Sequence, residues 1–154
     1  MEILKFNKEF VERTINILNS YKGKFEFSNL LNCTLGLIIL PYENMGSSSY
    51  WKSEIVRLED IPSFTIKLFE PIKKMKKGRI IRYPKTIGVL LRKIRNGLAH
   101  QNIKPINKNN EFVGIKIFNK YKNKLDLDIE FTREELSNFA IYISNKYLEE
   151  DASG

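Results

Sequence analysis

The chain has 154 residues, of which 42% are hydrophobic and 12% aromatic, so it is expected to fold rather than to stay disordered. A single cysteine, Cys33, excludes an internal disulfide, and the longest apolar run, residues 35–40, is too short to span a bilayer. With no signal-peptide pattern at the start, we predict a cytoplasmic protein without a membrane segment. One domain over residues 1–150 and a frayed tail at 151–154 are expected.

The net charge of +8 is unevenly distributed along the sequence. Subtracting the twelve basic residues between Pro71 and Asn110, a stretch without Asp or Glu, leaves the rest of the chain at −4. Such a field attracts polyanions, of which nucleic acid is the commonest large example, although a solvated lysine surface is the alternative. The basic residues are Lys73, Lys74, Lys76, Lys77, Arg79, Arg82, Lys85, Arg92, Lys93, Arg95, Lys104 and Lys108.

The first half of the chain predicts two main helices. Apolar residues recur at helical spacing over residues 10–21, and residues 29–40 are apolar on nearly all sides, which predicts a central buried helix that ends at Pro41. A loop is expected over residues 42–50 and a short helix over 51–58. Residues 63–83 are compatible with strand or helix.

The second half predicts a helix, a hairpin and a final helix. Tyr83-Pro84 opens a helix whose apolar stripe leads to the RNGLAH segment. Residues 113–117 and 125–131 alternate with period two, which predicts a β-hairpin with a loop of several residues. Thr132 and Glu135 form a capping box for the last helix. The predicted fold class is mainly α, a helical bundle with a small β-hairpin before the C-terminal helix.

The sequence excludes several kinds of chemistry. It has no glycine-rich phosphate loop, no HExxH motif, and too few His and Cys residues for a zinc site, so no metal and no cofactor are expected. The only histidine, His100, lies five residues after Arg95 in RKIRNGLAHQNI. An imidazole that moves protons and a guanidinium that binds phosphate suit the attack of an RNA 2′-hydroxyl on the adjacent phosphate. The alternative is a histidine that only stabilises the end of a helix.

Helix geometry constrains this pair. On an unbroken helix, Arg95 and His100 point about 140° apart and do not converge. Either the helix breaks near Gly97, or a second copy of the chain completes the site.

The RNGLAH segment resembles the R-x4-6-H motif of the HEPN superfamily, and the order of predicted elements is similar to a plasmid-borne bacterial HEPN subgroup. The resemblance implies a HEPN-like helical bundle that forms a homodimer, in which Arg and His residues from both subunits line one cleft. It implies Arg95 as the phosphate clamp, His100 as the general acid and base, and Asn96 as a supporting catalytic residue. Arg92 and Lys93 are additional predicted contacts to substrate phosphates.

The resemblance also suggests a biological role. It implies a metal-independent endoribonuclease that leaves a 2′,3′-cyclic phosphate, in a toxin–antitoxin or phage-defence setting with a cognate antitoxin or immunity protein as a possible partner. Asn102 stands where some HEPN toxins carry a modified tyrosine, so that form of control is not expected. The alternative is a non-catalytic HEPN-like dimer that binds RNA or a partner protein.

Overall fold

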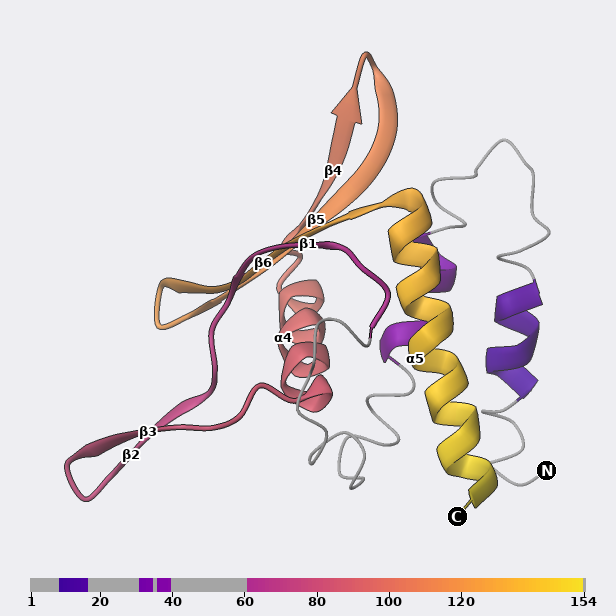
Figure 1. Ribbon diagram of the computed structural model, residues 1–154. Helices are drawn as coiled ribbons and strands as arrows, with labels where there is room; N and C mark the ends of the chain where they lie inside the picture. Colours follow the sequence, from indigo (N-terminus) through magenta and orange to yellow (C-terminus); the bar gives the residue numbers. More distant parts are fainter. Residues whose placement is uncertain (1–8, 17–30, 35, 40–60, 154) are drawn as a thin grey trace.

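The computed structural model describes residues 9–16, 31–34, 36–39 and 61–153. Residues 9–16, 31–34 and 36–39 are helical, in agreement with the first two predicted helices, whereas the loop and short helix expected at 42–58 lie outside the described residues. From residue 61 onward the elements are β1 (Thr65–Phe69), β2 (Lys73–Lys76), β3 (Arg79–Arg82), α4 (Ile87–Ala99), β4 (Ile103–Lys108), β5 (Glu111–Tyr121), β6 (Lys124–Thr132) and α5 (Arg133–Ser153), arranged as in Figure 1.

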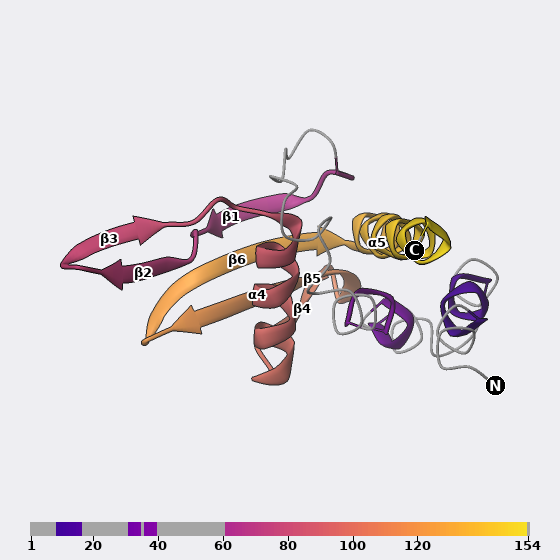
Figure 2. The same ribbon diagram turned by 90° about the horizontal axis from the view of Figure 1, so that it is seen from below.

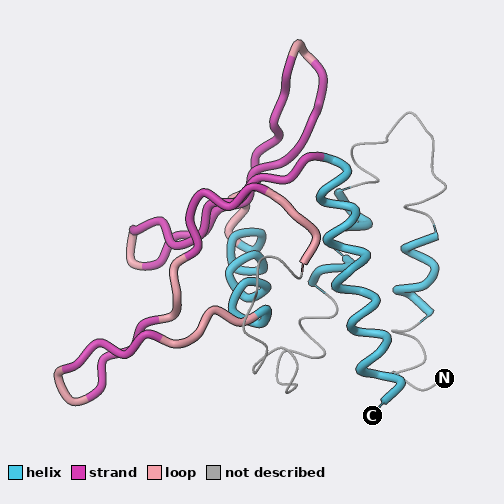
Figure 3. Tube along the Cα trace, viewed as in Figure 1, coloured by secondary structure: helices cyan, strands magenta, loops and turns pink. Residues whose placement is uncertain are grey.

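The strands form a larger sheet than the sequence predicted. Four strands pair in the order β1-β6-β5-β4, all antiparallel, and β2 pairs with β3 in a separate two-stranded hairpin. Strands therefore make up much of the described chain (Figure 3), and the predicted mainly α bundle is wrong. The predicted hairpin is present as β5 and β6, but its turn is tight, with Lys122 and Asn123 at positive φ between the strands.

One face of the sheet carries the core. Ile115 and Ile117 of β5 and Leu127, Ile129 and Phe131 of β6 are at most 1% exposed, and they pack in one cluster with the buried residues of α4 and α5. Figure 1 shows α4 below the strands and α5 descending from the end of β6. The core therefore joins both helices to the two central strands.

Helix α5 begins as the sequence predicted. The backbone N–H of Thr132 donates to Glu135 Oε1 at 2.9 Å, and the N–H of Glu135 donates to Thr132 Oγ1 at 3.1 Å, which is a complete capping box. The helix continues to Ser153, into the segment expected to be a frayed tail. The N-terminal helical residues meet it at Ser144, whose Oγ donates to the carbonyl of Ala140 at 2.7 Å and lies 3.4 Å from the carbonyl oxygen of Leu37.

Candidate active site

Helix α4 carries the predicted catalytic residues and begins at a well-formed cap. Thr86 Oγ1 accepts a hydrogen bond from the N–H of Val89 at 3.2 Å, so Thr86 is the N-cap and Pro84 precedes the helix instead of lying in its first turn. The predicted apolar stripe is buried at Ile87, Leu90, Leu91 and Ile94, while Leu98 is partly buried. This stripe holds α4 against the sheet.

The helix does not break at Gly97. It runs to Ala99, and a Cβ atom at Gly97 would lie 2.4 Å from the backbone oxygen of Phe118 and 3.4 Å from Ile117 Cγ2 on β5. Glycine is thus needed here because helix and strand approach closely, not because the helix ends. One of the two routes by which Arg95 and His100 were expected to meet is therefore absent from the single chain.

We expect Gly97→Ala to destabilise the protein by about 1–3 kcal/mol, because the added methyl group must displace β5 backbone. Alanine is the better helix former by about 1 kcal/mol, so a net loss would reflect the crowding alone. Gly36→Ala is the matched control, since its Cβ would lie 3.5 Å from Phe10 Cζ, which is ordinary contact. The free energies of unfolding of both variants are measured in urea. Equal stability of the two variants would contradict the close approach.

Helix α4 ends at Ala99, and the chain then reverses direction in a hydrogen-bonded turn. His100 is the C-cap, and its N–H donates to the carbonyl of Asn96 at 3.1 Å. Gln101 has a φ of 58°, and the N–H groups of Gln101 and Asn102 donate to the carbonyls of Leu98 at 3.0 Å and Gly97 at 2.7 Å. This is the Schellman pattern, here with glutamine in the left-handed position that usually holds glycine.

The reversal is also attached to the sheet. The carbonyl of Asn102 accepts a hydrogen bond from the N–H of Phe118 at 3.1 Å. The same strand residue contributes the oxygen that faces Gly97. The backbone that follows His100 is therefore hydrogen-bonded to β5, and the backbone that precedes it lies close against β5. His100 itself is exposed.

Arg95 and His100 border one exposed strip of α4. At 100° per residue they lie about 140° apart around the helix axis, and the shorter way round passes the other residues of the strip. Arg95 and Asn96 are partly buried, and Arg92, Ala99 and His100 are exposed. Within one chain the guanidinium and the imidazole flank the strip from opposite edges, and the helix does not bring them together. If a second copy of the chain packed on this strip, the Arg95 and His100 side chains of each copy would lie beside those of the other.

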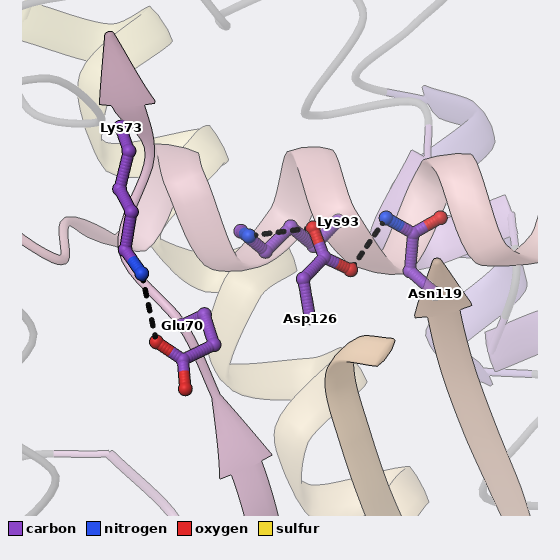
Figure 4. A network of polar contacts seen from close by, with 5 residues as sticks. All are labelled: Glu70, Lys73, Lys93, Asn119 and Asp126. Carbon is purple, nitrogen blue, oxygen red and sulfur yellow. Dashed lines mark hydrogen bonds and ion pairs between the residues drawn. The ribbon is translucent and has the colours of Figure 1, made fainter. Parts of the chain in front are cut away.

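Lys93 occupies a different environment from the other predicted residues. It is 6% exposed, and its Nζ lies 2.7 Å from Asp126 Oδ2, while Asn119 Nδ2 donates to Asp126 Oδ1 at 2.8 Å. Figure 4 shows this network between α4 and the ends of β5 and β6. The sequence predicted Lys93 as a substrate contact, but in the structure its charge is directed to Asp126. We therefore assign it the attachment of α4 to the sheet.

No sequence signal identified the partner of Lys93, because Asp126 lies 33 residues away in a run with period-two alternation, where its position looks like that of a solvent-facing residue. Nor did it indicate the left-handed backbone at Gln101, since that position favours glycine or asparagine. In the part of the chain that the structure describes, no group of three or more His, Cys, Asp and Glu side chains could hold a metal ion. No described helix is long and apolar enough to cross a membrane.

A comparison with protein families matches residues 1–153 to HEPN pEK499 p136. The chain belongs to this HEPN family. HEPN domains are commonly ribonucleases and often act as dimers that bind RNA, so family membership supports a ribonuclease-like or nucleotide-related function in general. Neither a search of curated proteins nor a search of solved structures finds a match. The resemblance inferred from RNGLAH is confirmed at the level of the family.

Proposed function

We propose that this HEPN protein is a metal-independent endoribonuclease whose active site is completed by a second copy of the chain. The observation that carries the proposal is the unbroken α4, which holds Arg95 and His100 at the two edges of one exposed strip. Two such strips packed about a two-fold axis would bring the arginines and histidines of both subunits into one cleft. Asn96 lies within the strip as a polar neighbour of the reacting groups, and Arg92 is exposed beside it for contact with substrate phosphates.

The proposed reaction needs only these side chains. The imidazole of His100 in one subunit removes the proton from the RNA 2′-hydroxyl, and the 2′-oxygen forms a bond to the adjacent phosphorus. The bond from phosphorus to the 5′-oxygen breaks, and a protonated imidazole, supplied by the other subunit, donates a proton to that leaving oxygen. Arg95 stabilises the negative charge that develops on the phosphoryl oxygens. The products are a 2′,3′-cyclic phosphate and a 5′-hydroxyl.

The test is to incubate the purified protein with a structured RNA in EDTA and to analyse the ends of the fragments. We expect cutting in single-stranded or loop regions, with cyclic phosphate at the 3′ ends, because paired bases and A-form geometry restrict the in-line attack. An all-deoxy oligonucleotide of the same sequence is the control, since it lacks the nucleophile. Cleavage of the deoxy strand, or dependence on a divalent ion, would contradict the mechanism.

The second candidate is a non-catalytic HEPN-like dimer that binds RNA or a partner protein. The distribution of charge favours it, because half of the twelve basic residues in the 71–110 stretch lie on β2, β3 and the turn between them, away from α4. This candidate predicts salt-sensitive binding of RNA without turnover. Either candidate function is compatible with a cognate antitoxin or immunity protein that covers the α4 strip. Isolation of such a protein in complex with this chain would support the toxin–antitoxin or phage-defence setting.

A further inference from the structure

The β2–β3 hairpin is a basic arm that stands apart from the four-stranded sheet. It carries six cations, its eight strand residues are all exposed, and it projects from the body of the molecule (Figures 1 and 2). The cations are Lys73, Lys74, Lys76, Lys77, Arg79 and Arg82. The turn is tight, with Lys77 at a φ of 49° and Gly78 at 74°, as in a type I′ hairpin.

The pairing within this arm places like charges opposite one another. Lys73 lies opposite Arg82, and Lys76 lies opposite Arg79. Directly opposed like charges destabilise a sheet, and a two-stranded hairpin is only marginally stable alone in water. Only Lys73 is near an acid, Glu70 Oε2 at 4.0 Å; among the described residues no acidic side chain pairs with the other cations of the arm. The arm therefore has an uncompensated charge that an anionic partner would neutralise.

The need to prevent edge-to-edge pairing with another strand does not explain the surface of the β2–β3 arm. Charged side chains, lysine above all, prevent edge pairing, but that role needs no apolar side chains beside them. The arm also exposes apolar side chains between its cations, with Met75 at 68%, Ile80 at 64% and Ile81 at 36% exposure. Both faces of the arm carry cations and apolar groups, because Ile81 shares a face with Lys74, Lys76 and Arg79, and Met75 and Ile80 share the other with Lys73 and Arg82. Cations beside apolar groups suit a nucleic-acid strand, which presents phosphates beside the faces of its bases.

A second hairpin tip lies on the same side of the molecule. Figures 1 and 2 both show the turn between β5 and β6 pointing the same way as the β2–β3 turn. This tip carries Lys120, Lys122 and Lys124 and no acid between residues 119 and 125. Tyr121 is 63% exposed there, and Lys122 Nζ lies 5.5 Å from the centre of its ring. An exposed aromatic ring between lysines is the surface on which single-stranded bases stack.

We infer that the two hairpins together bind one single-stranded segment of RNA, in which the phosphates lie along Lys74, Lys76 and Arg79 and a base stacks on Tyr121. By the alternation of strand residues, these three cations lie on one face of the arm, because Lys76 and Arg79 are opposite partners and Lys74 is two residues from Lys76. The inference rests on the proposed function in one respect only, that the bound polyanion is the RNA that α4 cleaves.

The test measures binding of a labelled single-stranded RNA to protein that carries His100→Ala, so that no cleavage intervenes. The arm variant is Lys74→Gln/Lys76→Gln/Arg79→Gln. The matched control, Lys85→Gln/Lys104→Gln/Lys108→Gln, removes the same charge from exposed positions of the same basic stretch. Fluorescence anisotropy is recorded from low to moderate salt, and thermal unfolding establishes that each variant is folded.

We expect the arm variant to bind about 30-fold more weakly or worse, and its slope of log K against log salt to fall by about 2, at about 0.7 per lost phosphate contact. The control should lose only a few-fold in affinity. Tyr121→Ala should weaken binding by about 10-fold with the slope unchanged, and Tyr121→Phe should retain the affinity, because stacking needs the ring and not its hydroxyl.

The failures of the two proposals are distinguishable. If the arm and control variants bind RNA equally well, or if the protein does not bind RNA, the inference is overturned. An acidic protein is then the expected partner of the arm. Arm-dependent binding by a wild-type protein that does not cut RNA overturns the proposed function alone. Cleavage that does not depend on the arm overturns the inference alone.

Discussion

Replacement of His100 by alanine is expected to lower the rate of RNA cleavage in EDTA by about 10²–10⁴-fold, because general acid–base catalysis contributes about that factor. Arg95→Ala is expected to lower it by about 10²–10³-fold through loss of charge stabilisation. Single-turnover rates with excess protein isolate the chemical step. His100→Asn should be as inactive as the alanine variant, since an amide keeps polarity at the helix end but does not take up a proton. Lys108→Ala, on an exposed strand residue, is the control and should retain its rate.

Mixing the two inactive variants tests whether the site is shared between subunits. An unbroken α4 holds Arg95 and His100 apart within one chain, so the proposed site takes its arginines and histidines from both copies. A mixed dimer of Arg95→Ala and His100→Ala keeps one guanidinium and one imidazole in the shared cleft, whereas each variant alone lacks one kind of group altogether. Random exchange makes about half of the dimers mixed, so the mixture should cleave RNA faster than either variant alone. No recovery, despite mixed dimers seen by native mass spectrometry, would place the complete site in each chain. Undiminished cleavage by both single variants would remove the catalytic assignment.

Loss of the Lys93 ammonium is expected to produce the largest change in stability. Lys93→Ala leaves Asp126 beside the core without its cation, and removal of one partner of a buried pair costs about 3–5 kcal/mol. The Asp126 side chain is 16% exposed, so we expect the lower end of that range. The free energy of unfolding is measured in urea, with the slope examined to confirm two-state behaviour.

The double variant Lys93→Met/Asp126→Leu separates the buried charge from the packing. Because both charges are removed together, it should recover part of the stability lost by Lys93→Ala; the recovery is incomplete because Asn119 Nδ2 loses its acceptor. Lys67→Ala is the matched control: Lys67 Nζ pairs with Glu130 Oε1 at 2.8 Å, but its side chain is 53% exposed, and its loss should destabilise the protein far less than the loss of Lys93. If Lys93→Ala unfolds no more readily than Lys67→Ala, the ion pair does not hold α4 to the sheet.

The sequence predicted the elements that bury a whole face. Residues 113–117 and 125–131 alternate because one side of β5 and of β6 packs on the helices. The strands that it missed lie at edges or outside the main sheet. β4 contains Pro105 and is buried at no position, and β2 and β3 are exposed throughout. A strand without a buried face has no alternation of apolar and polar residues. The sequence pattern therefore did not predict these strands, and the number of strands was underestimated.

The site was predictable to a similar extent. The type and spacing of Arg95 and His100 predicted the chemistry, and helix geometry predicted that an unbroken helix holds the two groups apart. A helix break near Gly97 was one of the two predicted alternatives, whereas in the structure Gly97 permits close contact with β5. Lys93 was predicted to contact substrate phosphates, because the ion pair with Asp126 depends on tertiary structure that a linear pattern does not contain.

The straight course of α4 past Gly97 has a consequence for how activity would depend on the amount of protein. If each chain holds only half of the reacting groups in usable positions, isolated chains are inert, and turnover begins only when two chains meet. Below the dissociation constant of the dimer, the activity per chain then rises in proportion to concentration, so total activity rises roughly as its square. A cell that kept the protein scarce would keep its RNA intact without any inhibitor, and a modest increase in synthesis would release a disproportionate response.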